Sequence, residues 1–179
     1  MPIRRAGYRG ARAMKRVSTN FRQPILKKVR RPSTSRPRRN DLRQGEREFE
    51  RLLAMGVIDQ MREIRRGIKA AVLVQIAHVV LGIPLRELLT GLHLPRSNIQ
   101  RKIRTGARLR VGESCRVSRA LIIFQQAVDA FDDKGFAADW FQRENVELGG
   151  GRPLDMLDTR SGFERVSDVL ARLAFGICV

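Results

Sequence analysis

Five polar side chains on one predicted helix have the residue types that read DNA. Arginine can donate to both major-groove acceptors of guanine, asparagine or glutamine can bond adenine, and serine can bond phosphate oxygens. Around them, residues 96–120 hold eight basic residues and one acidic residue, which would meet the phosphates on both sides of a groove. We therefore predict double-stranded DNA as a ligand. The five residues are Ser97, Asn98, Gln100, Arg101 and Arg104.

Two short helices, predicted at residues 84–91 and 96–105, must position these side chains. Leucine and isoleucine recur at helical spacing in both, which predicts a helix-turn-helix at about residues 84–105. Two positions are unusual, because His93 stands where the turn normally has glycine and Pro95 where serine or threonine normally caps the second helix. Histidine tolerates a positive φ, and proline can begin a helix without capping it. The same pattern also suits two amphipathic helices that merely pack in a bundle, so this segment alone leaves DNA binding open.

Helical spacing continues through the rest of the chain from Asp41, and strand alternation is nearly absent, which predicts an all-α fold. Further helices are predicted at residues 41–55, 59–80, 113–131, 134–143 and 162–174, with a helical turn at 154–157. The helix at 59–80 should be buried in its C-terminal half, which is apolar nearly all round. Either Asp158 or Thr159 should cap the last helix. The helix at 113–131 should bury the stripe Val117, Leu121, Phe124, Val128 and Phe131.

Charge divides the 179 residues into three parts. The formal net charge of +18 is made of +14 in residues 1–40, +8 in residues 41–120 and −4 in residues 121–179. We therefore expect a basic N-terminal tail at 1–40, a helical region with the helix-turn-helix at 41–120 and a separate C-terminal domain at 121–179. The tail has no acidic residue and few apolar ones, which predicts that it is disordered alone.

Three interpretations of the tail remain open. It can be an arm that binds phosphates and adds salt-sensitive affinity for nucleic acid. It can be an organelle transit peptide, since it is rich in arginine. It can also be an idle extension, with translation beginning at Met14 or Met55.

The segment from Trp140 to the C-terminus has a recognisable pattern. It carries a tryptophan, the run N-V-E-L-G-G-G-R-P-L-D-M-L-D-T, a helix, and L-A-R-L-A-F-G near its end. This resembles the toxin-binding domain of the MbcA/ParS/Xre antitoxin family. The resemblance covers roughly residues 57–179 and is strongest in the last 45. The matching positions are Trp140, Asn145, Leu148, Gly149, Gly150, Pro153, Leu154, Leu157, Asp158, Thr159, Leu170, Arg172 and Gly176.

The resemblance implies an antitoxin that neutralises a RES-domain, NAD-degrading toxin through its C-terminal domain and represses its own operon through an Xre-like helix-turn-helix. The apolar end, Phe175–Val179, would either pack back on the domain or enter the toxin. Many motif residues can equally be present for folding alone, since glycines permit a tight loop and proline fixes a helix entry. The residues implied in toxin binding are Leu148, Gly149, Gly150, Pro153, Leu154, Asp158, Thr159, Arg172, Phe175, Gly176 and Ile177.

Other functions have less support in the sequence. A free-standing helix-turn-helix regulator or RNA binder without a toxin partner is the main alternative. An enzyme is not expected, because no catalytic constellation or phosphate-binding glycine motif is present. We expect no cofactor, no metal and no membrane association, a cytoplasmic location, and a homodimer, since helix-turn-helix repressors usually read paired half-sites. The acidic residues Asp129, Asp132, Asp133 and Asp139 are interpreted as a solvated face.

Overall fold

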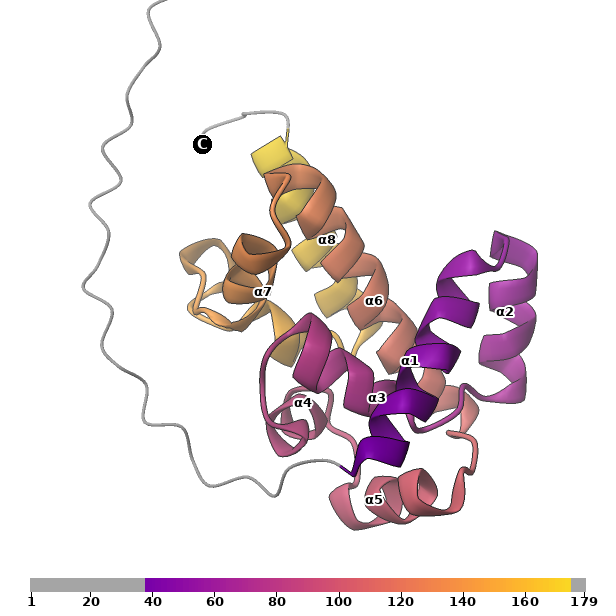
Figure 1. Cartoon of the computed structure of the whole chain (residues 1–179). Coiled ribbons are helices and arrows are strands. Elements are labelled where there is room, and N and C mark those ends of the chain that lie inside the picture. The colour runs from indigo at the N-terminus through magenta and orange to yellow at the C-terminus, as the bar shows by residue number, and fades with distance from the viewer. Residues whose placement is uncertain (1–37, 175–179) are drawn as a thin grey trace, which may run out of the picture. The chain divides into compact units, whose positions relative to one another are not determined.

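A computed structural model describes residues 38–174 of the chain, and every regular element within that range is helical (Figure 1). The predicted all-α fold is therefore confirmed. The expected disorder of the tail concerns residues 1–40, of which only 38–40 are described. The role given to Phe175–Val179 also lies outside the described residues.

The first two helices form an amphipathic pair. Helix α1 (Arg39–Ala54) has the position and end that the sequence predicts, and α2 (Val57–Arg66) follows it after a short break. Helix α1 packs closely on the start of α3 (Val72–Gln75), because a Cβ on Gly45 would lie 2.6 Å from the Ala71 carbonyl oxygen. The Gln60 side chain donates hydrogen bonds to the carbonyl oxygens of Leu52 and Met55, which ties α2 to the end of α1.

The predicted continuous helix at 59–80 is wrong. Helix α2 ends at Arg66 with Gly67 as its C-cap, and helical structure resumes only at α3 (Val72–Gln75), followed by a π-helical turn, η1 (Ile76–Val80). Gly67 has φ 90°, and a Cβ there would collide with the Leu109 carbonyl oxygen. The intervening backbone pairs with residues 107–109, where the Leu109 amide donates to the Ile68 carbonyl. Apolar spacing runs through this break and outweighs the one local sign that Gly67 gives, a glycine at the end of a helix. The apolar half after the break is buried, as expected.

Helices α4 (Leu85–Gly91) and α5 (Arg96–Thr105) confirm the predicted pair. His93 has φ 50°, the left-handed conformation that the turn requires. Pro84 and Pro95 hold the cap positions with extended backbone and no side-chain cap. The apolar residues that face each other across the pair are all buried: Leu88, Leu89, Leu92, Leu94, Ile99 and Ile103.

The long helix α6 (Val111–Phe131) contacts α2 on one side and the C-terminal helices on another. Its most buried apolar residues are Val117, Ala120, Ile123 and Ala127, so only the first member of the predicted stripe is fully buried. Leu121, Phe124, Val128 and Phe131 are half-buried, because the fully covered face of α6 is the one that carries Val117, Ala120, Ile123 and Ala127. The expected boundary between residues 120 and 121 falls inside this helix.

The C-terminal part folds around α6. Helix α7 (Lys134–Gln142) begins with Asp133 accepting a hydrogen bond from the Phe136 amide. A loop with two 3-10 turns, η2 (Val146–Leu148) and η3 (Pro153–Met156), leads to α8 (Arg160–Ala174). Thr159 is the residue that caps α8, because its hydroxyl accepts a hydrogen bond from the Gly162 amide at 3.0 Å.

Among residues 38–174 no single helix is long and apolar enough to cross a membrane. Val72–Val80 and Leu85–Gly91 are long and apolar enough only when taken together, and they are bent by 106° relative to each other.

Candidate functional site

The five side chains predicted to contact DNA share the outer surface of α5. Ser97, Gln100, Arg101 and Arg104 are exposed, and Asn98 is half-buried. The Arg101 guanidinium donates to the Asn98 side-chain oxygen at 3.3 Å, so these two side chains lie together at the surface. The opposite face of α5, with Ile99, Lys102 and Ile103, is buried. The arrangement leaves a polar helix face, with both hydrogen-bond donors and acceptors, open to a large ligand.

Half of the basic residues at 96–120 are used inside the protein, which the sequence did not indicate. Lys102 is buried against Glu113, and the other three donate hydrogen bonds to backbone carbonyl oxygens: Arg108 to Gly67, Arg116 to Leu92 and His93, and Arg119 to Leu157 and Asp158. Of the eight basic residues, the other four, Arg96, Arg101, Arg104 and Arg110, are exposed. Arg108 is exposed as well, although it forms hydrogen bonds within the protein.

A buried ion pair fixes α5 against α6. Lys102 Nζ lies 2.5 Å from Glu113 Oε2, and each side chain is only about a tenth exposed. Burial alone would raise the pKa of the Glu113 carboxyl, but hydrogen bonds from Lys102 and from the Arg110 amide lower it further than burial raises it. The pKa therefore lies below its ordinary value of 4.5 and the pair is charged at neutral pH. This pair holds α5 in place against α6.

A second buried carboxylate joins α1, α2 and the segment before α6. Glu63 accepts from Arg51 at 2.6 Å and from Arg108 at 2.5 Å. Burial raises the pKa of this carboxyl, and the two arginines lower it by more, so it too lies below 4.5. Glu63 therefore stabilises the break after α2, because Arg108 also donates to the Gly67 carbonyl oxygen.

The glycine-rich loop between α7 and α8 has a defined internal structure. Asn145 accepts a hydrogen bond from the Glu147 amide through its side chain and from the Gly150 amide through its carbonyl. Gly149 and Gly150 have φ of 70° and 83°, in the region where glycine is favoured. Both glycines are exposed, whereas Leu148, Pro153 and Leu154 are buried. Of these five residues, only the two glycines are accessible to a partner, and the other three are packed inside.

The remaining residues implied in toxin binding are spread over several places. Arg172 is half-buried and pairs with Glu147 at 2.7 Å, which links α8 to the glycine loop. Thr159 is exposed and caps α8, and Asp158 lies 3.7 Å from His93 in the turn between α4 and α5. Phe175, Gly176 and Ile177 lie outside the described residues.

The glycine-rich loop is joined directly to α4. A Cβ on Gly91 would lie 2.6 Å from Leu154 Cγ, so the helix and η3 are in close contact. Arg152 bridges the same two elements, because it pairs with Glu87 of α4 at 3.1 Å and with Asp155 of η3 at 2.7 Å. The two candidate surfaces are therefore built on one continuous core.

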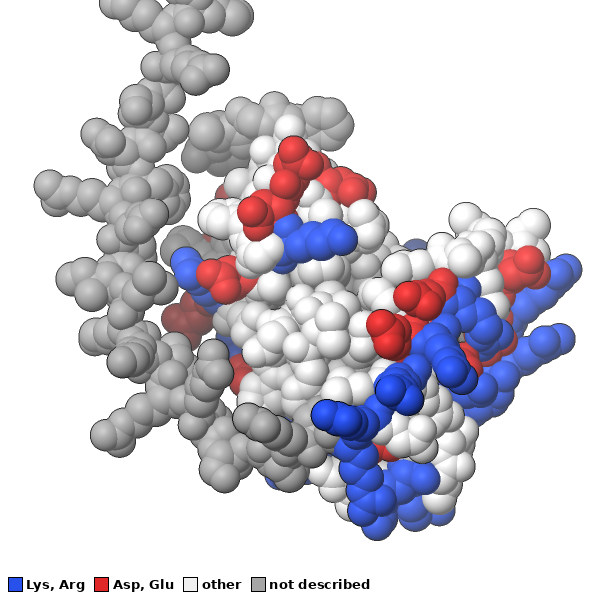
Figure 2. All heavy atoms as spheres, viewed as in Figure 1, with Lys and Arg blue, Asp and Glu red and all other residues white. Residues whose placement is uncertain are grey.

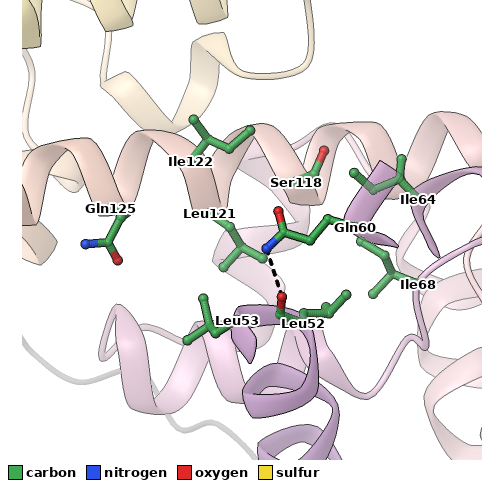
Figure 3. Close-up of a pocket in the computed structure, with 9 residues that line it drawn as sticks. All are labelled: Leu52, Leu53, Gln60, Ile64, Ile68, Ser118, Leu121, Ile122 and Gln125. Carbon is green, nitrogen blue, oxygen red and sulfur yellow. Dashed lines mark hydrogen bonds between the residues drawn. The ribbon is translucent and has the colours of Figure 1, made fainter. Parts of the chain in front are cut away.

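An apolar groove lies apart from both surfaces, between α1, α2 and α6 (Figure 3). Its volume is about 200 Å³, and none of the residues that line it is charged. Leu53 is 55% exposed and Ile122 47% exposed at its mouth, and Val57 and Met61 extend the apolar surface along the same face of α2. The lining residues are Leu52, Leu53, Gln60, Ile64, Ile68, Ser118, Leu121, Ile122 and Gln125.

Charge is unevenly distributed over the described surface. Figure 2 shows Lys and Arg side chains gathered over α1, α2 and α5, with Asp and Glu more frequent at the end formed by the C-terminal helices. The four aspartates at 129, 132, 133 and 139 are all exposed, as predicted. Within residues 38–174 no group of three or more His, Cys, Asp or Glu is placed to hold a metal ion.

Comparison with known proteins identifies the C-terminal part. Residues 126–176 match the family described as the antitoxin Xre/MbcA/ParS C-terminal toxin-binding domain. The class is therefore a helical protein that carries a toxin-binding domain. An "Antitoxin Xre" of Yersinia enterocolitica is 32% identical over 101 residues, which cover 56% of this chain and 68% of that protein. An "Antitoxin Xre" of Photorhabdus laumondii is 41% identical over 66 residues, covering 36% and 45%. The chain belongs to the Xre/MbcA/ParS antitoxin family. It is an antitoxin of a toxin–antitoxin system, and its partner is a toxin.

Proposed function

We propose that this antitoxin neutralises a RES-domain, NAD-degrading toxin by direct binding through its C-terminal domain, and that it represses its own operon by binding promoter DNA through α4 and α5. The observation that carries the proposal is the attachment of a toxin-binding domain, matched at residues 126–176, to a helix pair with an exposed face of DNA-reading residue types. The protein acts by binding alone, in the cytoplasm where its promoter lies, and needs no cofactor.

The toxin half of the proposal is tested by co-expression. The antitoxin should protect cells from a RES-domain toxin encoded beside it and should copurify with that toxin. Protection should be accompanied by recovery of the cellular NAD level. Copurification with a toxin that does not consume NAD would keep the antitoxin assignment and reject the RES partner. A chain that binds its promoter but protects from no neighbouring toxin would favour the alternative, a free-standing regulator.

Replacing Asn98 or Arg101 by alanine should relax the preference for promoter DNA. Each side chain is placed on the outer face of α5, and loss of a good base contact costs about 1 to 3 kcal/mol of discrimination. The ratio of affinities for promoter and random duplexes, measured by fluorescence anisotropy at one salt concentration, should therefore fall roughly 5-fold to 150-fold. Wild-type protein that binds both duplexes equally would contradict specific repression.

A homodimer would let two copies of α5 read paired half-sites. Two chains of net charge +18 repel each other, so they need an uncharged face at which to meet, and the apolar groove is such a face. Its protruding Leu53, Val57 and Ile122 beside a hollow suit a two-fold contact in which each copy offers both features.

Leu53→Asp should convert the dimer into a monomer. Burying one leucine contributes about 1.5 to 3 kcal/mol, so dimer affinity should fall at least about tenfold. Sedimentation velocity on the full chain reports the change. Val79→Asp is the matched control, since Val79 is also exposed but does not line the groove. An equal effect of both variants, or a wild type that is a monomer at every concentration, would contradict this interface.

A further inference from the structure

A polar depression beside α5 carries positive charge that the described protein does not use. It has a volume of about 500 Å³ and lies along the N-terminal half of α1 and the segment before α3. The residues that line it are Asn40, Arg43, Gln44, Arg47, Glu48 and Lys69. It therefore contains three cationic side chains and one carboxylate.

The single carboxylate is already neutralised. Glu48 is buried and pairs with Lys69 at 2.5 Å and with Arg51 at 3.0 Å. Arg43 and Arg47 are exposed, and neither forms an ion pair with any residue among 38–174. Glu46 and Glu50, the exposed acids of the same helix, do not line the depression. The depression thus presents two uncompensated guanidinium groups.

The depression adjoins the C-terminal end of α5. A Cβ built on Gly106, the residue that caps α5, would lie 3.4 Å from Gln44 Nε2 of α1. Arg104 is exposed on the last turn of α5, two residues before that cap. Figure 2 shows the basic side chains of α1 and α5 on the same side of the described structure. A ligand along α5 would therefore extend toward Arg43 and Arg47.

We propose that Arg43 and Arg47 of α1 form a binding site for the phosphate backbone of double-stranded DNA beside the segment read by α5. The inference rests on the DNA binding proposed above and adds a second helix to that interface. A guanidinium can bond two phosphate oxygens at once, and the amides of Asn40 and Gln44 can donate to the same backbone. Phosphate contacts of this kind fix the register of a protein on DNA without reading its sequence.

The test is the salt dependence of DNA binding by the full-length double variant Arg43→Gln, Arg47→Gln. Log affinity falls with log salt, and each lost phosphate contact makes that fall less steep by about 0.9. The slope of the double variant should therefore be shallower than that of the wild type by about 1.8. Between about 50 and 200 mM salt, wild-type protein should then lose about tenfold more affinity than the variant. The ratio of promoter to random-duplex affinity should stay unchanged.

The matched control removes the same charge elsewhere. Arg143→Gln, Arg160→Gln changes two exposed arginines that pair with Asp139 and Glu164 in the C-terminal part, and it should keep the wild-type slope. A slope in the Arg43, Arg47 variant equal to wild type, or a loss shared by the control, would overturn this site while leaving the DNA-binding proposal intact. If wild-type protein binds no duplex at all, the proposed repressor function fails instead.

Discussion

Removal of Phe175–Val179 is expected to abolish neutralisation of the toxin and to leave promoter binding nearly intact. These residues follow α8 directly, they are apolar in sequence, and the family match reaches residue 176. Burial of a phenylalanine or isoleucine in a partner contributes about 1.5 to 3 kcal/mol, so loss of two such side chains would weaken the complex by roughly 150-fold or more. Rescue of growth during toxin expression and duplex binding in vitro measure the two activities separately.

A full-length variant distinguishes a contact from a folding defect. Phe175→Ser, Ile177→Ser keeps the chain length and should reproduce the loss of rescue. Val79→Ser removes an exposed apolar side chain outside residues 126–176 and should rescue like wild type. Loss of both activities in the truncated protein, or of neither, would mean that the apolar end does not bind the toxin.

Glu113→Gln should destabilise the whole described fold. The substitution leaves the Lys102 ammonium buried without its partner, and an uncompensated buried charge costs about 3 to 5 kcal/mol. The midpoint of urea unfolding at neutral pH should therefore fall sharply. Because α5 is fixed to α6 through this pair, promoter affinity should fall as well. The double variant Lys102→Met, Glu113→Gln removes both charges and should recover most of the lost stability.

Acid should reproduce part of this effect in the wild type. The pKa of Glu113 is lowered in the folded protein, so its contribution to stability is complete above its unfolded value near 4.5 and is lost as pH falls through the folded value. Glu63 behaves in the same direction. Unfolding measured across that acidic range should be less pH-dependent in Glu113→Gln than in wild type. Equal acid sensitivity of the two proteins would show that the Lys102–Glu113 pair contributes little.

The helices that end at strong local signals are the ones the sequence predicts correctly. Pro84, Pro95 and Gly106 flank α4 and α5, and those two helices have the expected bounds within one residue. The break at residues 67–71 could not be foreseen in the same way. It depends on pairing with residues 107–109, some forty positions later, and apolar residues continue at helical spacing on both sides of Gly67. Gly67 accounts for the end of α2, but the extended backbone after it is explained only by this distant contact.

The candidate site divides in a similar manner. Residue types and helical spacing placed the five polar residues on one face of α5. They could not separate the basic residues that face solvent from those that bind inside, such as Lys102 and Arg119, because that depends on which acid or carbonyl the fold brings near. The proposed phosphate contacts Arg43 and Arg47 could not be predicted, because α1 is remote in sequence from α5 and their proximity appears only in the folded chain, where Gly106 lies beside Gln44.

The contact between α4 and the glycine-rich loop couples the two halves of the described structure. Gly91 admits Leu154 only because it has no side chain, and Arg152 needs Glu87 on the other side of the same contact. A chimera that takes its N-terminal half from one relative and its C-terminal half from another would separate these partners wherever the junction lies between residues 91 and 152. A replacement of the C-terminal half alone would therefore also replace the residues that Gly91 and Glu87 of α4 contact.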